Sequence, residues 1–223
     1  MCMRSMMLGA AAAVALGLLC WCTVTTDRTA HAAEPKTAPL PAGMEGIDMD
    51  EAMKRCMELG TPGPHHTKLN GFVGNWKLTV KCWMGGPGSE ACVSTGKSTV
   101  KWILDGRYLM EEVDAEMLMP GPDGEMKPIP FRGLGLTGYD NYQNMYTSTW
   151  ADSMSTAMMV MRGTWNKSGL ALYGEMDEPM LEVRGRPIKI THTMADERSH
   201  VMRMYDLHAG DDYLVMEITY ERQ

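Results

Sequence analysis

The sequence predicts a mostly β protein in which a single antiparallel, up-and-down meander closes into a barrel. From Gly74 onward, short segments with alternating apolar and polar residues are separated by turn residues. No helix long enough for a parallel crossover fits between these segments, so neighbouring strands must pair antiparallel. Trp76 stands near the start of the first segment and Arg222 at the end of the last, which suits a sheet whose edges meet.

The turn residues divide this region into about ten strands. Asp105-Gly106 is typical of a tight hairpin, and residues 209–212 are a second turn of the same character. The stretch from Pro120 to Pro130 contains four prolines, which predicts a long loop at one mouth of the barrel. The predicted strands are 72–84, 91–104, 107–117, 131–139, 145–152, 156–165, 169–177, 186–195, 199–206 and 213–222.

The N-terminal residues 1–32 have the pattern of an export signal peptide. Arg4 supplies a positive charge, an apolar run of 15 residues extends from Leu8 to Cys22, and Ala30-His31-Ala32 offers a cleavage site. A membrane anchor is the alternative, but this run is shorter than the ~20 residues of a spanning helix. The sequence therefore predicts an exported protein, periplasmic or secreted, with no stable membrane span after cleavage.

Three further parts follow the signal. Residues 33–47 are rich in Pro and Ala and predict a flexible tether. Residues 48–70 predict a helical segment that begins at Asp48 or Asp50 and breaks at Gly60, with apolar residues at helical spacing that suit a lid or pad on the domain. Residues 71–223 form the predicted barrel domain.

The formal net charge of −7 becomes −8 once Arg4, Asp27 and Arg28 are removed with the signal. Lys and Arg are scattered, and no basic run occurs in the sequence. Nucleic acid and anionic membranes both require a concentrated positive patch, so the sequence argues against them as partners.

Three cysteines remain beyond the signal, namely Cys56, Cys82 and Cys92. Cys82 and Cys92 lie on the two arms of a predicted hairpin, where cross-strand Cβ atoms approach closely enough for a disulfide. Whether they are bonded stays open, and Cys56 is then either free or paired between chains.

Gly74-Asn75-Trp76 resembles the G-x-W signature of the calycin group, which includes the lipocalins, fatty-acid-binding proteins and nitrobindin-like barrels. In that group the Trp closes one end of the barrel and a cation from the last strand covers its ring. The resemblance implies that Trp76 and Arg222 form such a closure, a structural role.

A closer resemblance covers most of the chain, from His66 to Arg222, and is to the domain of unknown function 1579 family. It implies a calycin-like β-barrel with no assigned reaction and no agreed ligand. The segments that carry it are Gly74-Asn75-Trp76, Gly106-Arg107-Tyr108-Leu109, Phe131-Arg132-Gly133-Leu134-Gly135, Gly138-Tyr139-Asp140-Asn141, Thr149-Trp150-Ala151-Asp152-Ser153-Met154 and Glu217-Ile218-Thr219-Tyr220-Glu221-Arg222.

The favoured function is the binding of a small apolar or amphipathic ligand inside the barrel, where a few polar groups orient a molecule held by apolar walls. The alternative interpretation is that an arginine and Asp152 form a buried ion pair whose only role is to fix the strand register. The expected anchors are Arg107, Arg132, Tyr139 and Asp152, and the expected walls are Trp150, Met158 and Met161.

Metal or haem transport is an alternative, although no cofactor is favoured. Twenty of the 24 methionines lie beyond the signal, and flexible thioethers either fill a core that has only two phenylalanines or bind Cu(I). Nitrobindin-like barrels hold haem through a late histidine, and three late histidines occur here. The candidate copper ligands are Met154, Met158, Met159, Met161, Met202 and Met204 with His192, His200 or His208.

A third alternative is a structural or interaction module with a filled interior, which an interior void under ~100 Å³ would favour because ligand pockets are larger. An enzyme is the weakest interpretation. No nucleophile with its base, no pair of opposed carboxylates and no phosphate loop is recognisable. Glu111 and Glu112, for example, are adjacent on one strand and therefore point to opposite faces.

Overall fold

A computed structural model describes residues 43 and 46–223. The predicted signal, 1–32, and nearly all of the predicted tether, 33–47, lie outside the described residues. The chain from Asp48 to Gln223 forms one compact unit that contains the barrel.

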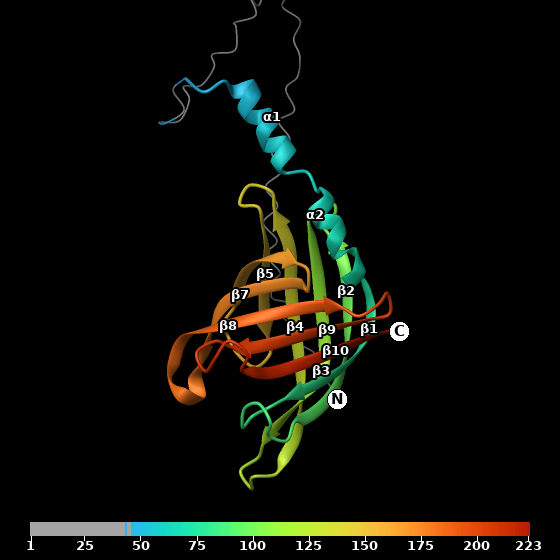
Figure 1. Ribbon diagram of the computed structural model, residues 1–223, viewed down its shortest axis with the longest axis vertical. Helices are drawn as coiled ribbons and strands as arrows, with labels where there is room; N and C mark the ends of the chain where they lie inside the picture. The colour runs from blue at the N-terminus through green and yellow to red at the C-terminus, as the bar shows by residue number, and fades with distance from the viewer. Residues whose placement is uncertain (1–42, 44–45) are drawn as a thin grey trace, which may run out of the picture. The chain divides into compact units, whose positions relative to one another are not determined.

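The barrel has ten strands and closes where β1 pairs with β10 (Figure 1). Each strand is antiparallel to both neighbours, so the predicted fold class, a closed up-and-down antiparallel barrel with a short N-terminal helix, is confirmed. The strands are β1 (Gly74–Cys82), β2 (Cys92–Ile103), β3 (Tyr108–Pro120), β4 (Met126–Asp140), β5 (Met145–Asp152), β6 (Met159–Asn166), β7 (Gly169–Glu178), β8 (Val183–Met194), β9 (Ser199–Asp206) and β10 (Leu214–Arg222).

Helical segments precede β1, as predicted, and a 3₁₀ turn, η2 (Pro179–Leu181), precedes β8. Helix α1 (Met49–Leu59) begins at Asp48, whose side chain accepts hydrogen bonds from the first turn. None of its residues is buried, and its role as a lid or pad on the domain stays a prediction. Helix α2 (Pro64–Thr67) buries His66, and the 3₁₀ helix η1 (Lys68–Phe72) buries Leu69 and Phe72.

The α2 end of the barrel is closed around Trp76, which is fully buried and donates from Nε1 to the carbonyl of Phe72 at 2.8 Å. The Arg222 guanidinium lies 4.3 Å from the indole ring centre. It also donates to the carbonyls of Val73, Gly71 and Glu197. One cation therefore ties the end of β10 to the segment that enters β1.

Residues 120–130 differ from the predicted loop, because β3 and β4 continue into this stretch as a long hairpin with a tip at residues 121–125. This hairpin projects from the end of the barrel away from α2 (Figure 1). The backbone N–H of Arg132 points away from β3, toward Ser153. Backbone N–H groups of a strand alternate in direction, so the nitrogens of Pro128 and Pro130 point to the same side as that of Arg132. Strand β5 does not extend along this part of β4, so the two prolines remove no hydrogen bond from the sheet.

The inner wall of the barrel is divided into two halves. Most of the buried inward-facing side chains lie toward the α2 end, among them Leu78, Val100, Leu109, Tyr146 and Leu170. Inward positions at the opposite end are only half-buried. We call five of these the open-end wall: Phe131, Trp150, Met159, Met176 and Met216.

Candidate functional site

A polar group lies inside the buried half of the barrel, centred on Glu111 of β3. The Ser98 hydroxyl on β2 donates to Glu111 Oε1 at 2.6 Å, and the Tyr220 hydroxyl on β10 is hydrogen-bonded to the same carboxyl. Burial raises the pKa of Glu111 above its usual value, and burial raises the pKa of Tyr220 well above 10. Both effects favour the neutral forms of these groups.

Two histidines adjoin this carboxyl. The ring of His200 on β9 stacks on Tyr220 with 4.0 Å between centroids, and His192 on β8 lies 6.2 Å from His200. Burial lowers the pKa of His200 to about 3 and that of His192 to about 4, so both rings are neutral near pH 7. His200 is only 2% exposed, and neither of its ring nitrogens has a hydrogen-bond partner.

A cavity of about 40 Å³ lies between these groups. Glu111 and His192 line it, which explains why both keep some accessible surface although they are inside the barrel. A space of this size holds a water molecule or a single ion, whereas pockets for organic ligands measure roughly 300 Å³ or more. The cavity is therefore too small for haem. We define the polar cluster as Ser98, Glu111, His192, His200 and Tyr220.

The open-end wall is apolar and has one polar contact of interest. The Trp150 indole donates from Nε1 to Asp152 Oδ2 at 3.1 Å, and its ring is stacked near Phe131 with 6.5 Å between centroids. A Cβ atom at Gly133 would collide with the indole, and one at Gly135 would press against it. The two glycines of β4 therefore provide the space in which Trp150 lies along the inner wall.

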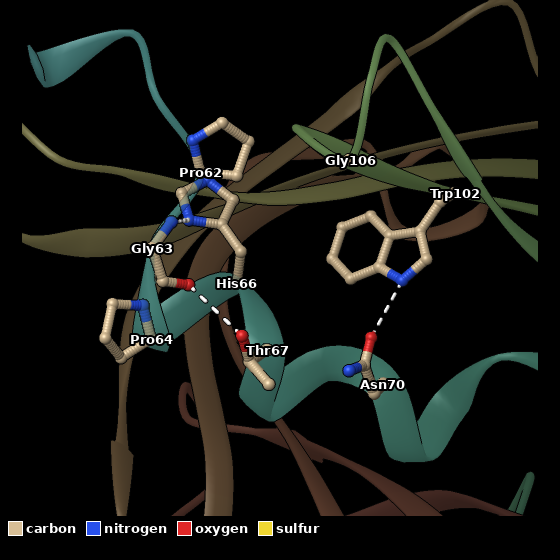
Figure 2. A pocket seen from close by; sticks show the side chains of 8 residues that line it. All are labelled: Pro62, Gly63, Pro64, His66, Thr67, Asn70, Trp102 and Gly106. Atoms are coloured by element: carbon tan, nitrogen blue, oxygen red, sulfur yellow. Dashed lines mark hydrogen bonds between the residues drawn. The ribbon is translucent and has the colours of Figure 1, made fainter.

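A separate groove of about 570 Å³ lies on the surface beside α2 (Figure 2). Several of its polar groups already have partners, because Trp102 Nε1 donates to Asn70 Oδ1 at 2.9 Å and His66 Nδ1 accepts from the Gly63 N–H at 3.0 Å. The groove is open to solvent and offers no unpaired buried group, so it is a weaker candidate than the interior.

Comparisons with known proteins identify the family. The profile described as "Protein of unknown function (DUF1579)" matches residues 61–222. The chain belongs to the DUF1579 family. No curated protein matches it. Among solved structures, a redesigned β-barrel is 13% identical, covers 71% of this chain and 95% of its own, and has a TM-score of 0.32.

The DUF1579 barrel brings together only some of the residues predicted from the sequence. Trp150, Asp152 and Met161 share one region of the inner wall on β5 and β6. Tyr139 also faces inward but lies toward the α2 end, stacked on His65 with 4.2 Å between centroids. Met161 is 4% exposed and belongs to the core.

The other predicted ligand residues lie outside the interior. Met158 is 65% exposed and Arg132 is exposed on the outer face, so the prediction that they contact an enclosed ligand is wrong. Arg107 lies in the β2–β3 turn, where its guanidinium donates to the Leu104 carbonyl at 3.1 Å. For Arg132 the reason is the period of two in β4, because its neighbours Phe131 and Gly133 face inward. Arg107 and Met158 lie in turns next to β3 and β6, outside the strands that form the inner wall.

Cys82 and Cys92 are direct partners across β1 and β2. Both thiols are free in this structure, and the predicted disulfide stays a prediction. The pKa of the Cys82 thiol is raised, mainly by burial and to a smaller extent by the neighbouring Cys92.

The candidate copper ligands are also divided by the fold. Met154 and Met158 are exposed, as is His208, so they do not join the others. Among the described residues, no group of three or more His, Cys, Asp or Glu side chains is placed to hold a metal ion. No helix in the described part of the chain is long and apolar enough to cross a membrane.

Sequence reasoning named His192, His200 and Glu111 separately but did not predict that they meet in the polar cluster of this DUF1579 protein. Its members come from five strands, and each looks in sequence like an ordinary polar residue in an alternating pattern. The alternation nevertheless contains one signal. Glu111 has the same parity as the apolar residues Leu109 and Val113, and this parity by itself places a carboxyl on the inward face of β3.

Proposed function

We propose that this protein is an exported barrel that binds one small apolar or amphipathic molecule at the open-end wall. The observation that carries the proposal is the accessibility of that wall. Phe131, Trp150, Met159, Met176 and Met216 all face inward and are only half-buried, whereas many inward residues toward the α2 end, such as Leu78, Leu109 and Tyr146, are buried. Apolar side chains that remain accessible inside a closed sheet are a characteristic of ligand-binding barrels.

The chemistry of the wall suits a ligand without fixed shape. Methionine side chains are flexible and polarisable, so three of them can adapt to different apolar surfaces. Trp150 adds a rigid aromatic face, and its indole N–H donates to Asp152. An amphipathic molecule would place its apolar part on the thioethers and its polar part toward solvent at the open end.

The α2 end supports a different expectation. Its cavity of about 40 Å³ is below the ~100 Å³ that separates a filled interior from a ligand pocket, so this half favours the alternative of a filled module. The binding proposal is therefore confined to the open-end wall.

The proposal is tested with a fluorescent fatty-acid analogue, 11-(dansylamino)undecanoic acid, added to delipidated protein. Energy transfer from the tryptophans of the barrel to the dansyl group reports uptake. We expect saturable binding of one probe per chain, with a Kd in the micromolar range or lower. Uptake without saturation, or no uptake by folded protein, would overturn the proposal and leave the barrel as a filled module.

Two variants on β6 separate the inner wall from nonspecific surface binding. Met159→Glu places a carboxylate on the open-end wall and should abolish uptake. Val160→Glu is the matched control, because Val160 is the next residue, is 53% exposed and faces outward. Equal loss in both variants, with circular dichroism unchanged, would locate the probe outside the barrel.

A further inference from the structure

Two carboxylates flank the open-end wall on the side of its mouth. On β5, Asp152 lies two residues beyond Trp150, and on β7, Glu178 lies two residues beyond Met176. A strand's period of two places each carboxylate on the same inward face as the wall residue before it. Strand β6 runs between β5 and β7, and its Met159 is the direct cross-strand partner of Trp150. The aromatic and thioether surface therefore has an acidic group on each side.

The sheet is irregular at one of these positions, but β7 keeps its alternation. Met176 is paired with Arg186, and Glu178 is paired with Val183. The extra residue is therefore in β8, which has two residues between these pairs where β7 has one. Both Asp152 and Glu178 are half-buried, as expected for groups at the inner edge of the mouth.

Neither carboxylate is neutralised by a cation of its own. Asp152 accepts from the Trp150 indole at 3.1 Å and from the Met154 N–H at 2.9 Å, and Glu178 accepts from the Met180 N–H at 3.2 Å. These donors are uncharged, and a carboxylate can accept more hydrogen bonds than this. No ion pair among the described residues includes either group.

One arginine faces the interior at this end and is already engaged. Arg186 donates to Asp206 through Nε at 2.9 Å and also through Nη2. The pKa of Arg186 is raised, first by this hydrogen bond and to a smaller extent by the charge of Glu178. Three carboxylates, those of Asp152, Glu178 and Asp206, thus share one guanidinium, and two negative charges are left without a basic partner.

The loops that border the mouth have the same sign of charge. The β1–β2, β3–β4, β5–β6, β7–β8 and β9–β10 connections all lie at this end, because the strands of an up-and-down barrel alternate in direction. These connections contain no Lys or Arg. An anion that enters here is repelled, and a cation is attracted. The acidic residues of the connections are Glu90, Asp123, Glu125, Glu182, Asp211 and Asp212.

We propose that the ligand of the open-end wall is a cationic amphiphile. Its head is an amine or a quaternary ammonium beside Asp152 and Glu178, and its apolar chain lies along the wall. The inference rests on the proposed function, because it names the ligand class of that same site. Trp150 suits this class as well, since an indole ring attracts organic cations to its face.

The test compares two ligands that share one chain and differ in the head group, dodecylamine and dodecanoate. Each is titrated calorimetrically into delipidated wild-type protein at pH 7.5 and low salt, below the concentration at which it forms micelles. At this pH the amine is positive and the carboxylate is negative. We expect one dodecylamine per chain, bound at least about tenfold more tightly than dodecanoate, and a smaller difference at high salt.

Three charge variants locate the preference. Asp152→Asn and Glu178→Gln each remove a charge but keep an oxygen for the existing hydrogen bond. Each should weaken dodecylamine binding at least about threefold without weakening dodecanoate binding. Glu175→Gln is the matched control, because Glu175 is exposed on the same strand as Glu178 and has the outward parity. It should change neither affinity.

The outcomes separate this inference from the proposed function. If neither ligand binds folded wild-type protein, the proposed function is wrong and the ligand class is wrong with it. Equal affinities for the two ligands, or tighter binding of dodecanoate, would retain binding at the wall and overturn the cationic class. A loss of dodecylamine affinity in Glu175→Gln as large as in Glu178→Gln would also overturn it, because the preference would then come from the net charge of the protein.

Discussion

The buried histidines predict how the stability of the barrel depends on pH, and His200 gives the sharpest case. Its pKa is about 3 in the folded protein against 6.5 for an ordinary histidine. Between these values the unfolded chain binds a proton that the folded chain does not, so folding becomes less favourable as the pH falls below 6.5. The cause is burial, since a charged imidazole would be surrounded by apolar and aromatic groups.

The magnitude follows from the width of that interval. Each pH unit below 6.5 costs about 1.4 kcal/mol, so lowering the pH from 6.5 to 5 removes about 2 kcal/mol of unfolding free energy through His200. His192 acts in the same direction, and the raised pKa of Glu111 acts in the opposite one. The lowered pKa values of Asp196 and Asp206 start from 3.8, so these groups affect mainly pH values below this window.

The contribution of His200 is isolated by comparing wild type with His200→Leu in urea unfolding at pH 7.5, 6.5 and 5. The variant should lose about 2 kcal/mol less than wild type between pH 6.5 and 5. His208→Leu, at an exposed position, should lose as much as wild type. Identical pH dependence in wild type and His200→Leu would refute the conclusion that the ring is buried and neutral.

Three further predictions concern the closure, the inner wall and the buried carboxyl. Arg222→Met, which loses the contacts to Trp76 and three carbonyls, should lower the free energy of unfolding by about 3 kcal/mol in a urea titration. Gly133→Ala should cost about 1–3 kcal/mol through collision with Trp150, and a cycle with Trp150→Leu should recover most of that cost. Because the pKa of Glu111 is raised in the folded protein, wild type should lose stability as the pH rises and this carboxyl ionises. Glu111→Gln should abolish that loss, as measured by thermal melting from pH 5 to 9.

The sequence was sufficient for the fold because strand parity and turn chemistry are local. The limits of β5 and β9 coincide with the predicted 145–152 and 199–206. The failure at Pro120 to Pro130 has a specific reason. A proline interrupts a strand only where its missing N–H would face a partner strand. For Pro128 and Pro130 this depends on how far β5 extends alongside β4, and no local sequence pattern encodes that length.

The site was less predictable, because it depends on which strands meet across the barrel. Trp150 and Met161 were predicted as walls of the interior and do face inward, whereas alternation should have placed Arg132 outward, since its neighbours Phe131 and Gly133 share the opposite face. No sequence rule brings Glu111 of β3 to Tyr220 of β10. That contact exists only because the barrel closes.

The open-end wall and the polar cluster can be tested separately because buried apolar side chains lie between them. One inward step from His192 toward the open end is Ile190, whose strand partners Leu172 and Met204 complete a layer in which each residue is 8% exposed or less. Changes on opposite sides of such a layer are expected to act additively. Met159→Glu should therefore leave the contribution of His200 to the pH dependence of stability unchanged, and His200→Leu should leave uptake of the dansyl probe unchanged. Coupling between these variants would mean that one continuous interior space joins the two regions, which a cavity of about 40 Å³ beside His200 does not provide.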